Sequence, residues 1–470
     1  MIFRRSLAWA IALSSTTVQC LAKQSFRSTV YIDQYHPNIS FTIDYTGITH
    51  AIMAFADPLA FMDEKNFPTP PLMNVSDVRK VFENGTKIGV ALGGWGPLST
   101  NFGYVSTKEN RTIFAKNLAS WVNKNGYDFV DIDWEYPGGN GAETPINGTR
   151  EIEDLPLFLC SIRDALGKKN STGDNGISLA VAGTEAGMLA FQNSIQTKPV
   201  WDSIDFITVM AYDLVNRVSN ATGHHSDVKG SKLAVQRYLD LGLAPEKINL
   251  GYTFYAKWFQ TAGPCNGTQL PIGCPIMKAQ TDNGTDTYAS GVLTFEPRYL
   301  NKTYPIDTQS LQVSPDGTCG YKDSNILTNY KCGEPYCCSD YGFCGDTKDH
   351  CIPNCQAGYG RCDGPDVVAS FQRAQHGFTT DVENGALWYL DTAVTPHMFW
   401  TWENNIIMTR KYDDIVNNMT LGGVSGWSLG EDSFNWEHVG IMGQMAMMRQ
   451  SSQPVQAQDP DDENACGNEA

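Results

Sequence analysis

The sequence predicts an α/β fold built on a parallel sheet, and two observations support that class. Apolar runs rich in β-branched and aromatic residues recur along the chain, with helical patterns between them. One of these runs, at 127–137, remains apolar around its acidic residues, which is typical of a strand covered on both faces. Eight strand–helix units fit a closed (β/α)8 barrel, although the pattern alone also allows an open doubly wound sheet.

The candidate strands follow one another in chain order, at 29–32, 51–56, 88–92, 129–134, 177–182, 206–211, 248–254 and 424–429. One intervening helix has recognisable ends. Residues 106–109 (Ser-Thr-Lys-Glu) match a capping box, and Gly126 is placed to end the helix. Between them, three apolar residues are spaced for one helix face: Phe114, Leu118 and Trp121.

The run at 127–137 carries four acidic residues among its apolar ones. Side chains alternate along a strand, so Asp131, Asp133 and Glu135 share one face, whereas Asp128 has the opposite parity and stands at the start. Three carboxyl groups on a buried strand resist ionising together, so at least one should stay protonated near neutral pH. A carboxyl held in that state can act as general acid in glycosidic bond cleavage. The alternative is a solvent-facing acidic stripe on an edge strand.

Composition and the amino-terminal segment indicate the compartment and exclude some partners. A net charge of −17 argues against nucleic acid as a partner. Residues 1–22 resemble a secretory signal peptide whose apolar core is too short to span a bilayer. Thirteen cysteines also favour an oxidising compartment. We therefore expect a secreted glycoprotein, extracellular or associated with a cell wall, that is a monomer and does not enter a membrane. Its candidate glycosylation sites are Asn38, Asn74, Asn84, Asn110, Asn147, Asn170, Asn220, Asn266, Asn283, Asn301 and Asn418.

The spacing Asp128-x-x-Asp131-x-Asp133-x-Glu135, followed by Tyr-Pro, closely resembles the signature of family 18 glycoside hydrolases, the chitinases, of the fungal type. Segments at 91–95 (Ala-Leu-Gly-Gly-Trp), 210–213 (Met-Ala-Tyr-Asp) and 426–429 (Gly-Trp-Ser-Leu) agree with the family in its order. The resemblance covers residues 27–450. It implies a (β/α)8 TIM barrel with an α+β insertion between strands seven and eight, from about residue 258 to 420.

The chain departs from the family's pattern at two positions. Ala91 stands where the family usually has serine, and Phe129 stands where it usually has glycine. Neither change removes a catalytic group. Because Ala91 lacks a hydroxyl, the hydrogen bonds around the acids should differ from those usual in the family. This difference is expected to change the rate of the reaction rather than to abolish it.

The resemblance also implies a role for each residue of the site. In this family the substrate's own 2-acetamido oxygen attacks the anomeric carbon, and the configuration is retained. Glu135 would be the general acid and base, Asp133 would orient the acetamide, and Asp131 would share a proton with Asp133. Tyr212 would bind the acetamide carbonyl, and Asp128 would be structural. The expected substrate-binding residues, whose aromatic members could instead be barrel core, are Trp95, Tyr136, Met210, Asp213 and Trp427.

Residues 319–362 resemble a hevein-type chitin-binding module inserted in the catalytic domain. Ser339, Tyr341 and Phe343 match the module's sugar-binding positions, and His350 stands where a third aromatic residue is usual. Aromatic rings stack on the apolar face of N-acetylglucosamine, so we expect chitin binding that is weaker than in a fully aromatic module. The alternative is a disulfide knot that only rigidifies the insertion.

A segment this short cannot bury enough core and needs disulfides, although spacing alone leaves 105 connectivities open for eight cysteines. The resemblance implies the pairs Cys319–Cys338, Cys332–Cys344, Cys337–Cys351 and Cys355–Cys362. Outside this segment we expect a loop disulfide between Cys265 and Cys274. Cys160 is expected as a buried free thiol, and Cys466 lies in an acidic tail at 451–470 that is expected to be disordered. Cysteines of a secreted chain fit disulfides better than zinc, so no metal or other cofactor is expected. The histidines at 224 and 225 are expected to be solvated.

The leading hypothesis is a secreted chitinase that hydrolyses β-1,4 bonds between N-acetylglucosamine units of chitin and chitooligosaccharides. An inactive chitinase-like lectin is an alternative, against which the presence of Glu135 argues. An endoglycosidase of N-glycans would share the acidic motif, but Trp95 and the chitin-binding module argue against it. A killer-toxin-like subunit remains an alternative that a partner chain bound through Cys466 would favour.

Overall fold

The computed structural model describes residues 26–451 except 38, 168–174, 264, 266–270, 282–283, 297–298, 300–309, 323–325, 353 and 434. The predicted signal peptide and residues 452–470 of the tail lie outside the described residues, as does Cys466. Among the described residues, no helix combines the length and the apolarity needed to cross a membrane.

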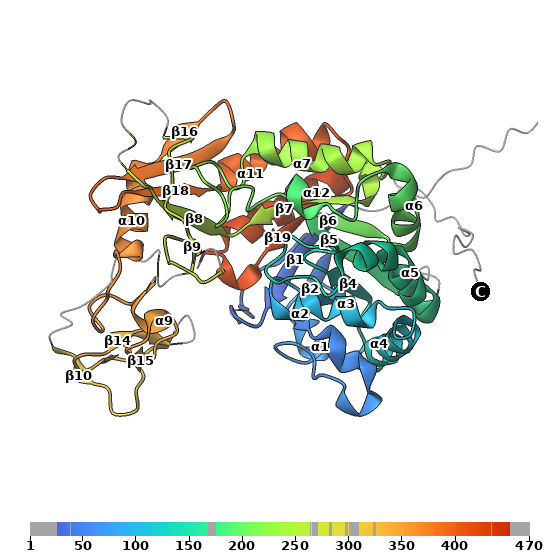
Figure 1. Cartoon of the computed structure of the whole chain (residues 1–470), viewed down its shortest axis with the longest axis horizontal. Coiled ribbons are helices and arrows are strands. Elements are labelled where there is room, and N and C mark those ends of the chain that lie inside the picture. Colours follow the sequence, from blue (N-terminus) through green and yellow to red (C-terminus); the bar gives the residue numbers. More distant parts are fainter. Residues whose placement is uncertain are drawn as a thin grey trace, which may run out of the picture.

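Eight parallel strands close into a barrel, on the right in Figure 1, which confirms the barrel and excludes the open sheet. The sheet closes because the first strand pairs with both the second and the last. Every predicted strand is present, with ends that differ by at most two residues. The strands are β1 (Arg27–Asp33), β2 (His50–Ala56), β3 (Lys87–Gly93), β4 (Phe129–Asp133), β5 (Gly176–Ala182), β6 (Phe206–Met210), β7 (Ile248–Thr253) and β19 (Gly423–Trp427).

Helices follow the barrel strands and cover the outside of the sheet (Figure 1). They are α1 (Val75–Val78), α2 (Pro97–Thr100), α3 (Phe102–Val105), α4 (Arg111–Asn125), α5 (Gly148–Leu166), α6 (Ser194–Ser203), α7 (Val228–Asp240), α11 (Asn405–Lys411) and α12 (Glu437–Ser451). Short turns of other helix types are η1 (Pro58–Met62), η2 (Glu64–Asn66), η3 (Glu185–Gly187), η4 (Pro245–Lys247), η6 (Tyr412–Asn417) and η7 (Leu429–Glu431).

The start predicted for α4 was wrong, and its end was right. The carbonyl of Thr107 accepts hydrogen bonds from the N–H groups of Asn110 and Arg111, so residues 107–110 form a tight turn. The helix begins only after that turn, at Arg111, and the capping box at 106–109 is not used. Gly126 ends it with φ +79°, a left-handed conformation that glycine adopts without steric cost.

The barrel interior below the acidic residues is filled by aromatic rings. Phe129 on β4 lies 6.0 Å from Phe206 on β6, centroid to centroid, and His50 packs edge-on against both rings. The bulk of Phe129 is accommodated by its neighbour Gly89 on β3, where a Cβ atom would come within 2.4 Å of the phenyl ring. Phe129 and Phe206 are buried in this aromatic layer, and Asp131, two residues further along β4, is fully buried above them.

The long connection after β7 forms the predicted α+β insertion, at the upper left in Figure 1. Its antiparallel sheet has the order β16 (Thr379–Asp381), β17 (Ala386–Asp391), β18 (Met398–Trp402), β8 (Tyr255–Gln260) and β9 (Ser290–Thr294). Helix α10 (Val367–Gly377) packs on this sheet through Phe371, whose ring lies 4.9 Å from that of Trp400.

The disulfide-rich module, residues 319–362, lies at the lower left in Figure 1. Strand β10 (Gln312–Val313) precedes it. The described residues of the module form only short elements, which are β11 (Tyr321–Lys322), β12 (Ile326–Leu327), β13 (Tyr330–Lys331), β14 (Cys337–Cys338), β15 (Cys344–Gly345) and α9 (Lys348–Cys351). Its interior consists mainly of cystines with Tyr359. The module contacts the insertion through hydrogen bonds from Tyr288 to Asp349 (2.8 Å) and from Tyr299 to Asp340.

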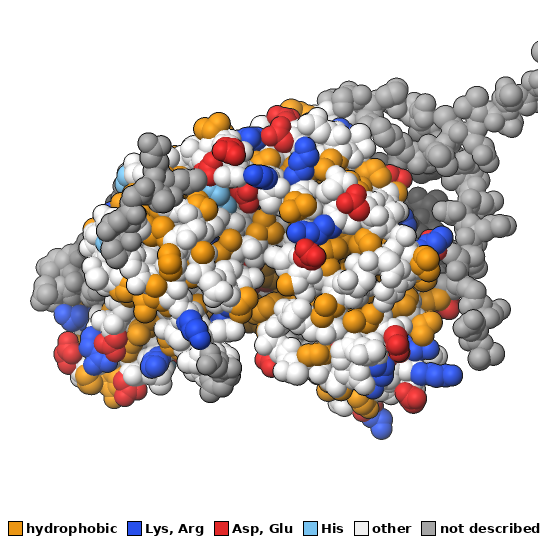
Figure 2. All heavy atoms as spheres, turned by 45° about the horizontal axis from the view of Figure 1, so that its top comes forward, with side chains coloured by type: hydrophobic (Ala, Val, Ile, Leu, Met, Phe, Trp, Pro, Cys, Tyr) orange, Lys and Arg blue, Asp and Glu red, His pale blue; other side chains and the backbone are white. Residues whose placement is uncertain are grey.

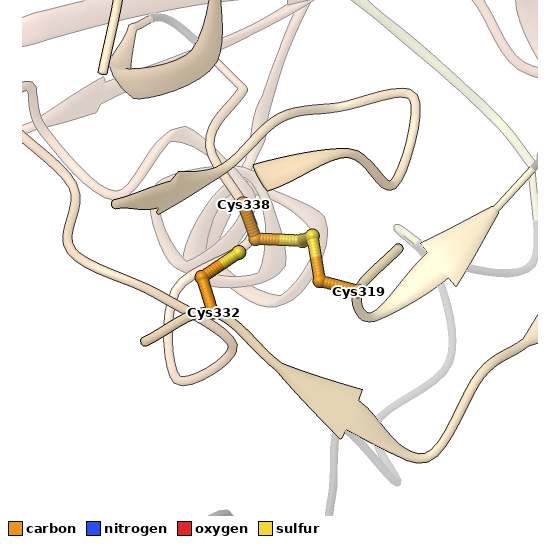
Figure 3. Close-up of side chains that lie close together, drawn as sticks. All are labelled: Cys319, Cys332 and Cys338. Carbon is orange, nitrogen blue, oxygen red and sulfur yellow. A yellow bond between two sulfur atoms is a disulfide. The ribbon is translucent and has the colours of Figure 1, made fainter. Parts of the chain in front are cut away.

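The disulfides of the module have the pairing that the resemblance implies: Cys319–Cys338, Cys332–Cys344, Cys337–Cys351 and Cys355–Cys362. Figure 3 shows the first of these bonds with the sulfur of Cys332 beside it. These neighbouring sulfurs are all oxidised, so they cannot serve as thiolate ligands of a metal. The loop disulfide Cys265–Cys274 is also present.

The prediction for Cys160 was wrong. This residue is half-buried on α5 and is disulfide-bonded, rather than a buried free thiol. Its partner is not among the described residues, because the ten other described cysteines pair with one another. The apolar residues around Cys160 form the inner face of the helix. Cys160 itself lies at the edge of that face, so the apolar pattern did not indicate its burial correctly.

Candidate active site

The acidic residues of β4 form a column that ends at the carboxyl end of the barrel. Asp131 is fully buried and Asp133 is 3% exposed, whereas Glu135 is half-buried. The strand ends at Asp133, so Glu135 belongs to the following loop rather than to the strand itself. The backbone N–H of Glu135 donates to Ser99 Oγ at 2.6 Å, and this bond fixes the loop to α2.

Asp131, at the bottom of the column, has a hydrogen-bond donor on each oxygen. Ser178 Oγ donates to Oδ1 at 2.6 Å from β5, and the Tyr31 hydroxyl donates to Oδ2 at 2.9 Å from β1. Burial raises the pKa of Asp131 to about 6, and these two hydrogen bonds limit the rise because they favour the carboxylate.

Asp133, in the middle of the column, is placed to hold a proton. Its Oδ1 is buried without a hydrogen-bond partner among the described residues. Burial raises the pKa of Asp133 well above its ordinary value, and the charges of Glu135 and Asp131 raise it further. An acid between two others in a dry site takes up the proton that relieves their repulsion.

Glu135 stands highest in the column and borders the open end of the barrel. Burial raises its pKa to about 7; a hydrogen bond with Tyr136 opposes the rise, and the charge of Asp213 adds to it. A carboxylic acid with this pKa is still protonated in part at neutral pH, which is the state required of a proton donor.

Asp213, beyond the end of β6, is held as an anion by groups from the insertion. Its backbone is left-handed (φ +52°), and its Oδ1 accepts from Lys257 Nζ at 2.7 Å and from the Tyr255 hydroxyl at 2.9 Å. Although burial acts to raise the pKa of Asp213, the Lys257 ammonium and His225 hold it well below its usual range. Lys257 and Tyr255 were not predicted from the sequence. A lysine inside the apolar run 254–259 was the signal, since a buried cation requires an anion beside it.

The prediction that both adjacent histidines are solvated was wrong. His225 is fully buried, with Nδ1 3.5 Å from Asp213 Oδ1, and burial lowers its pKa to about 4. His224 is 8% exposed, and its Nε2 lies 3.0 Å from Asp381 Oδ2 on β16. The loop that carries them contacts the sheet of the insertion through His224, whose ring lies against Thr401 on β18 and Asp381 on β16, and both rings are buried.

Aromatic side chains surround the top of the acid column. Trp427, at the end of β19, is half-buried and stacks on Phe55 with 5.5 Å between centroids. Trp95 is 57% exposed after β3, so it is not part of the core, and its ring lies 6.4 Å from that of Tyr136. In Figure 2 the surface is hollowed between the part built from the barrel and the part built from the insertion.

Two further predicted residues lie at the end of β6. Tyr212 is half-buried, and burial together with the charges of Asp133 and Glu135 raises its pKa, so it remains a neutral hydrogen-bond donor beside these acids. Met210, the last residue of β6, is 9% exposed and belongs to the wall of the barrel.

A second ionisable cluster, at the carboxyl ends of β1 and β19, was not predicted. His36 Nδ1 lies 3.1 Å from Asp33 Oδ1 and 3.3 Å from Glu431 Oε1, and Ser428 Oγ donates to Asp33 Oδ2 at 2.5 Å. Although burial acts to lower it, Glu431 and Asp33 raise the pKa of His36 to about 9. The three side chains are close enough to hold a cation. The protonated imidazole already supplies that positive charge, so the residues do not require a metal.

In the disulfide-rich module, two of the predicted residues are exposed rings and two are not. Tyr341 and Phe343 are 62% and 42% exposed on the same turn. Ser339 is only 5% exposed, and its Oγ accepts the N–H of Phe343 at 3.1 Å, so it fixes that turn. His350 is half-buried, packs against Gly345, and makes a 2.7 Å hydrogen bond with Thr347.

Solved structures share this fold. A chitinase from Rhizomucor miehei aligns with a TM-score of 0.59 at 15% identity, over 89% of this chain and 99% of that one. A plant class V chitinase mutant from Cycas revoluta, in complex with (GlcNAc)3, aligns with a TM-score of 0.55 at 16% identity, over 91% of this chain and all of that one.

Curated sequences are also similar. Chitotriosidase-1 of Mus musculus is 27% identical over 307 residues, which is 61% of this chain and 61% of that protein. Chitinase 1 of Aphanocladium album is 28% identical over 197 residues, or 38% of this chain and 44% of that protein. The chain thus spans less than two thirds of the length of these relatives. The family model described as "Glycosyl hydrolases family 18" matches residues 27–432, which include all eight barrel strands and the insertion. The chain therefore belongs to family 18 of the glycosyl hydrolases.

Proposed function

We propose that this protein is a chitinase that hydrolyses β-1,4 bonds between N-acetylglucosamine units. The observation that carries the proposal is the column of acids on β4, in which Glu135 reaches the open end of the barrel with its pKa raised to about 7. The family match and the similarity to proteins named chitinases support the substrate class.

Glu135 is the group proposed to transfer protons. Cleavage of a glycosidic bond requires a proton for the leaving oxygen and stabilisation of the positive charge that develops at the anomeric carbon. Glu135 donates that proton as the glycosidic bond breaks, and the resulting carboxylate then removes a proton from the attacking water. The side chain ends the cycle protonated, as it began.

The substrate's own acetamide group is the proposed nucleophile, so the anomeric configuration is retained. Its carbonyl oxygen bonds to the anomeric carbon and forms an oxazolinium ring that water later opens. Asp133 holds the acetamide N–H and shares its proton with the ionised Asp131, and the single negative charge of this pair offsets the positive charge of the ring. Tyr212, a neutral phenol beside Asp133 and Glu135, donates to the acetamide carbonyl.

The sugar chain is proposed to lie across the aromatic side chains at the carboxyl ends of the strands. Trp427, stacked on Phe55, forms a floor beneath the reacting sugar, and the exposed Trp95 forms a platform toward the leaving side. The Cycas revoluta structure similar to this one is a complex with (GlcNAc)3, which supports an oligosaccharide as ligand.

We also propose that the disulfide-rich module binds chitin and that the protein is secreted. Exposed Tyr341 and Phe343 support the first, because flat rings at a surface stack on sugars. The signal-like segment at 1–22, the glycosylation sites and the disulfides support the second.

The test compares wild type with Glu135→Gln on N-acetylchitohexaose, with product sizes and the initial anomer followed by NMR. We expect fresh β-anomer from the wild type. For Glu135→Gln we expect kcat to fall by about 10²- to 10⁴-fold while chitin adsorption is retained, because only the proton donor is removed. Glu185→Gln, which changes an exposed glutamate beyond β5, should turn over like the wild type.

Persistent turnover by Glu135→Gln would remove Glu135 from this role. An inactive wild type that still adsorbs to chitin would favour the lectin or the toxin-subunit hypothesis instead.

A further inference from the structure

The hydrogen bond at the bottom of the acid column comes from an unexpected strand. In the barrel sheet, Asp131 on β4 stands in register between Ala91 on β3 and Ser178 on β5. Ala91 is fully buried and offers only a methyl group, although serine is usual at this position in the family that the sequence resembles. Ser178, also fully buried, donates to Asp131 Oδ1 at 2.6 Å from the other side.

The two lower acids have unequal surroundings. Each oxygen of Asp131 receives one hydroxyl, from Ser178 and from Tyr31, and hydrogen bonds to a carboxylate are stronger than those to a neutral acid. Asp133 Oδ1 is buried and has no partner among the described residues. A proton shared by the two residues is therefore driven away from Asp131 and onto Asp133.

We propose that Ser178 is a positioning residue of the reaction, whose hydroxyl fixes Asp131 as the ionised neighbour beneath Asp133 in place of the hydroxyl that Ala91 lacks. This inference rests on the proposed chitinase function. Ser178 does not touch the substrate in this scheme. It acts through Asp131, which sets where the shared proton lies and hence how Asp133 meets the acetamide.

The groups facing Asp131 make its protonation sensitive to this one bond. Tyr31 faces it from β1, Asp133 lies above it on its own strand, and Tyr212 and Glu135 complete the cluster. Among the described residues, no cation contributes to the pKa of Asp131. Without the Ser178 hydroxyl, only the hydrogen bond from Tyr31 opposes the rise in the pKa of Asp131 that burial causes. Asp131 therefore takes up a proton at a higher pH.

The experiment measures kcat, KM and the pH profile of kcat/KM on N-acetylchitohexaose for Ser178→Ala and Ser178→Thr. For Ser178→Ala we expect kcat to fall about tenfold with KM little changed, because the lost bond is to a charged group. The acidic limb of the profile should move upward by about one pH unit. Ser178→Thr keeps the hydroxyl and should stay close to wild type.

The matched control is Ser425→Ala, on β19. Ser425 is likewise buried at 1% exposure, but its Oγ has no hydrogen-bond partner among the described residues. Removing such a hydroxyl should leave kcat and the acidic limb unchanged.

The most discriminating variant is the double substitution Ala91→Ser/Ser178→Ala, which offers Asp131 a hydroxyl from β3 in place of the one from β5. We expect it to recover the acidic limb and most of kcat, an outcome that a purely structural role of Ser178 would not produce.

The inference is overturned if Ser178→Ala shows the same pH profile as Ser425→Ala, or if the double variant loses activity as Ser178→Ala does. If the proposed function is wrong, the result is distinguishable, because the wild type itself would not hydrolyse the hexasaccharide. That outcome would also overturn the role proposed for Ser178.

Discussion

The acid column on β4 and the disulfide-rich module at 319–362 are held in place by different means. The column is fixed by strand pairing on both sides, by the aromatic layer beneath it and by hydrogen bonds from β1, β5 and α2. The described residues of the module form almost no apolar core, and its turns are fixed by four disulfides. The first arrangement buries its functional groups, whereas the second exposes them.

This difference follows from what each region is proposed to do. Proton transfer requires carboxyl groups whose pKa values are shifted, and only a dry, rigid site can hold like charges close together. Stacking on a polymer requires rings at the surface, which a small scaffold can present if covalent bonds replace the missing core. Chemistry and adsorption should therefore respond to different substitutions.

After Glu135→Gln, the largest separation between the two regions is expected for Asp133→Asn. Removing this carboxyl takes away the shared proton through which the acetamide group is coupled to the negative charge of Asp131, so kcat should fall by about 10²- to 10³-fold. Adsorption to chitin should not change, because the module keeps its exposed rings. Initial rates on N-acetylchitohexaose and the fraction of protein bound to chitin measure the two effects.

Asp128→Asn is the matched control within the same strand motif. Asp128 lies at the opposite end of β4, where its Oδ2 accepts from Arg79 and from the N–H of Ile88. Its loss should lower the free energy of unfolding by about 1–3 kcal/mol while kcat stays near wild type. A loss of kcat as large as that of Asp133→Asn would contradict the division between structural and chemical acids.

The pH dependence should also differ between the two regions. Glu135 must be protonated to act, and its pKa is raised to about 7, so kcat/KM should fall as the pH rises through about 7. Asp131 must be ionised, and its pKa is raised to about 6, so the rate should also fall as the pH drops through about 6. Stacking of Tyr341 and Phe343 on a neutral sugar requires no proton transfer, so adsorption should stay level over this range. A rate that still rises at pH 8 would contradict the role of Glu135.

The strands of the barrel were predictable because each carries its own signal. Periodicity located all eight, and the alternation of Asp131, Asp133 and Glu135 placed three acids on one face. Closure of the sheet was not readable from these local patterns, because it depends on the pairing of β1 with β19, nearly 400 residues apart in sequence. The resemblance to a family supplied that information.

The contacts that tune the site were not predictable for the same reason. The sequence separation is 47 residues from Ser178 to Asp131, and Lys257 reaches Asp213 from the insertion. Histidines 224 and 225 were mistaken for solvated residues because their loop is polar. Burial of that loop depends on the sheet above it, which no local pattern records.

Tyr341→Ala has the smallest expected effect. It tests most directly whether the module serves adsorption separately from the acid column. Tyr341 is 62% exposed on the turn that also carries Phe343. Losing one stacking ring should weaken adsorption to crystalline chitin about tenfold. Turnover of soluble hexasaccharide should be unchanged, since no acid of the barrel is touched.

Tyr336→Ala is the control for Tyr341→Ala, because Tyr336 is 46% exposed in the same module but lies outside the predicted sugar-binding positions. It should adsorb like the wild type, which would assign the effect to one surface rather than to a weakened scaffold. If Tyr341→Ala slowed soluble turnover as much as it weakened adsorption, the module and the cleft would act as one binding surface. The rings would then belong to the catalytic cycle, and exposure would no longer separate adsorption from chemistry in this chain.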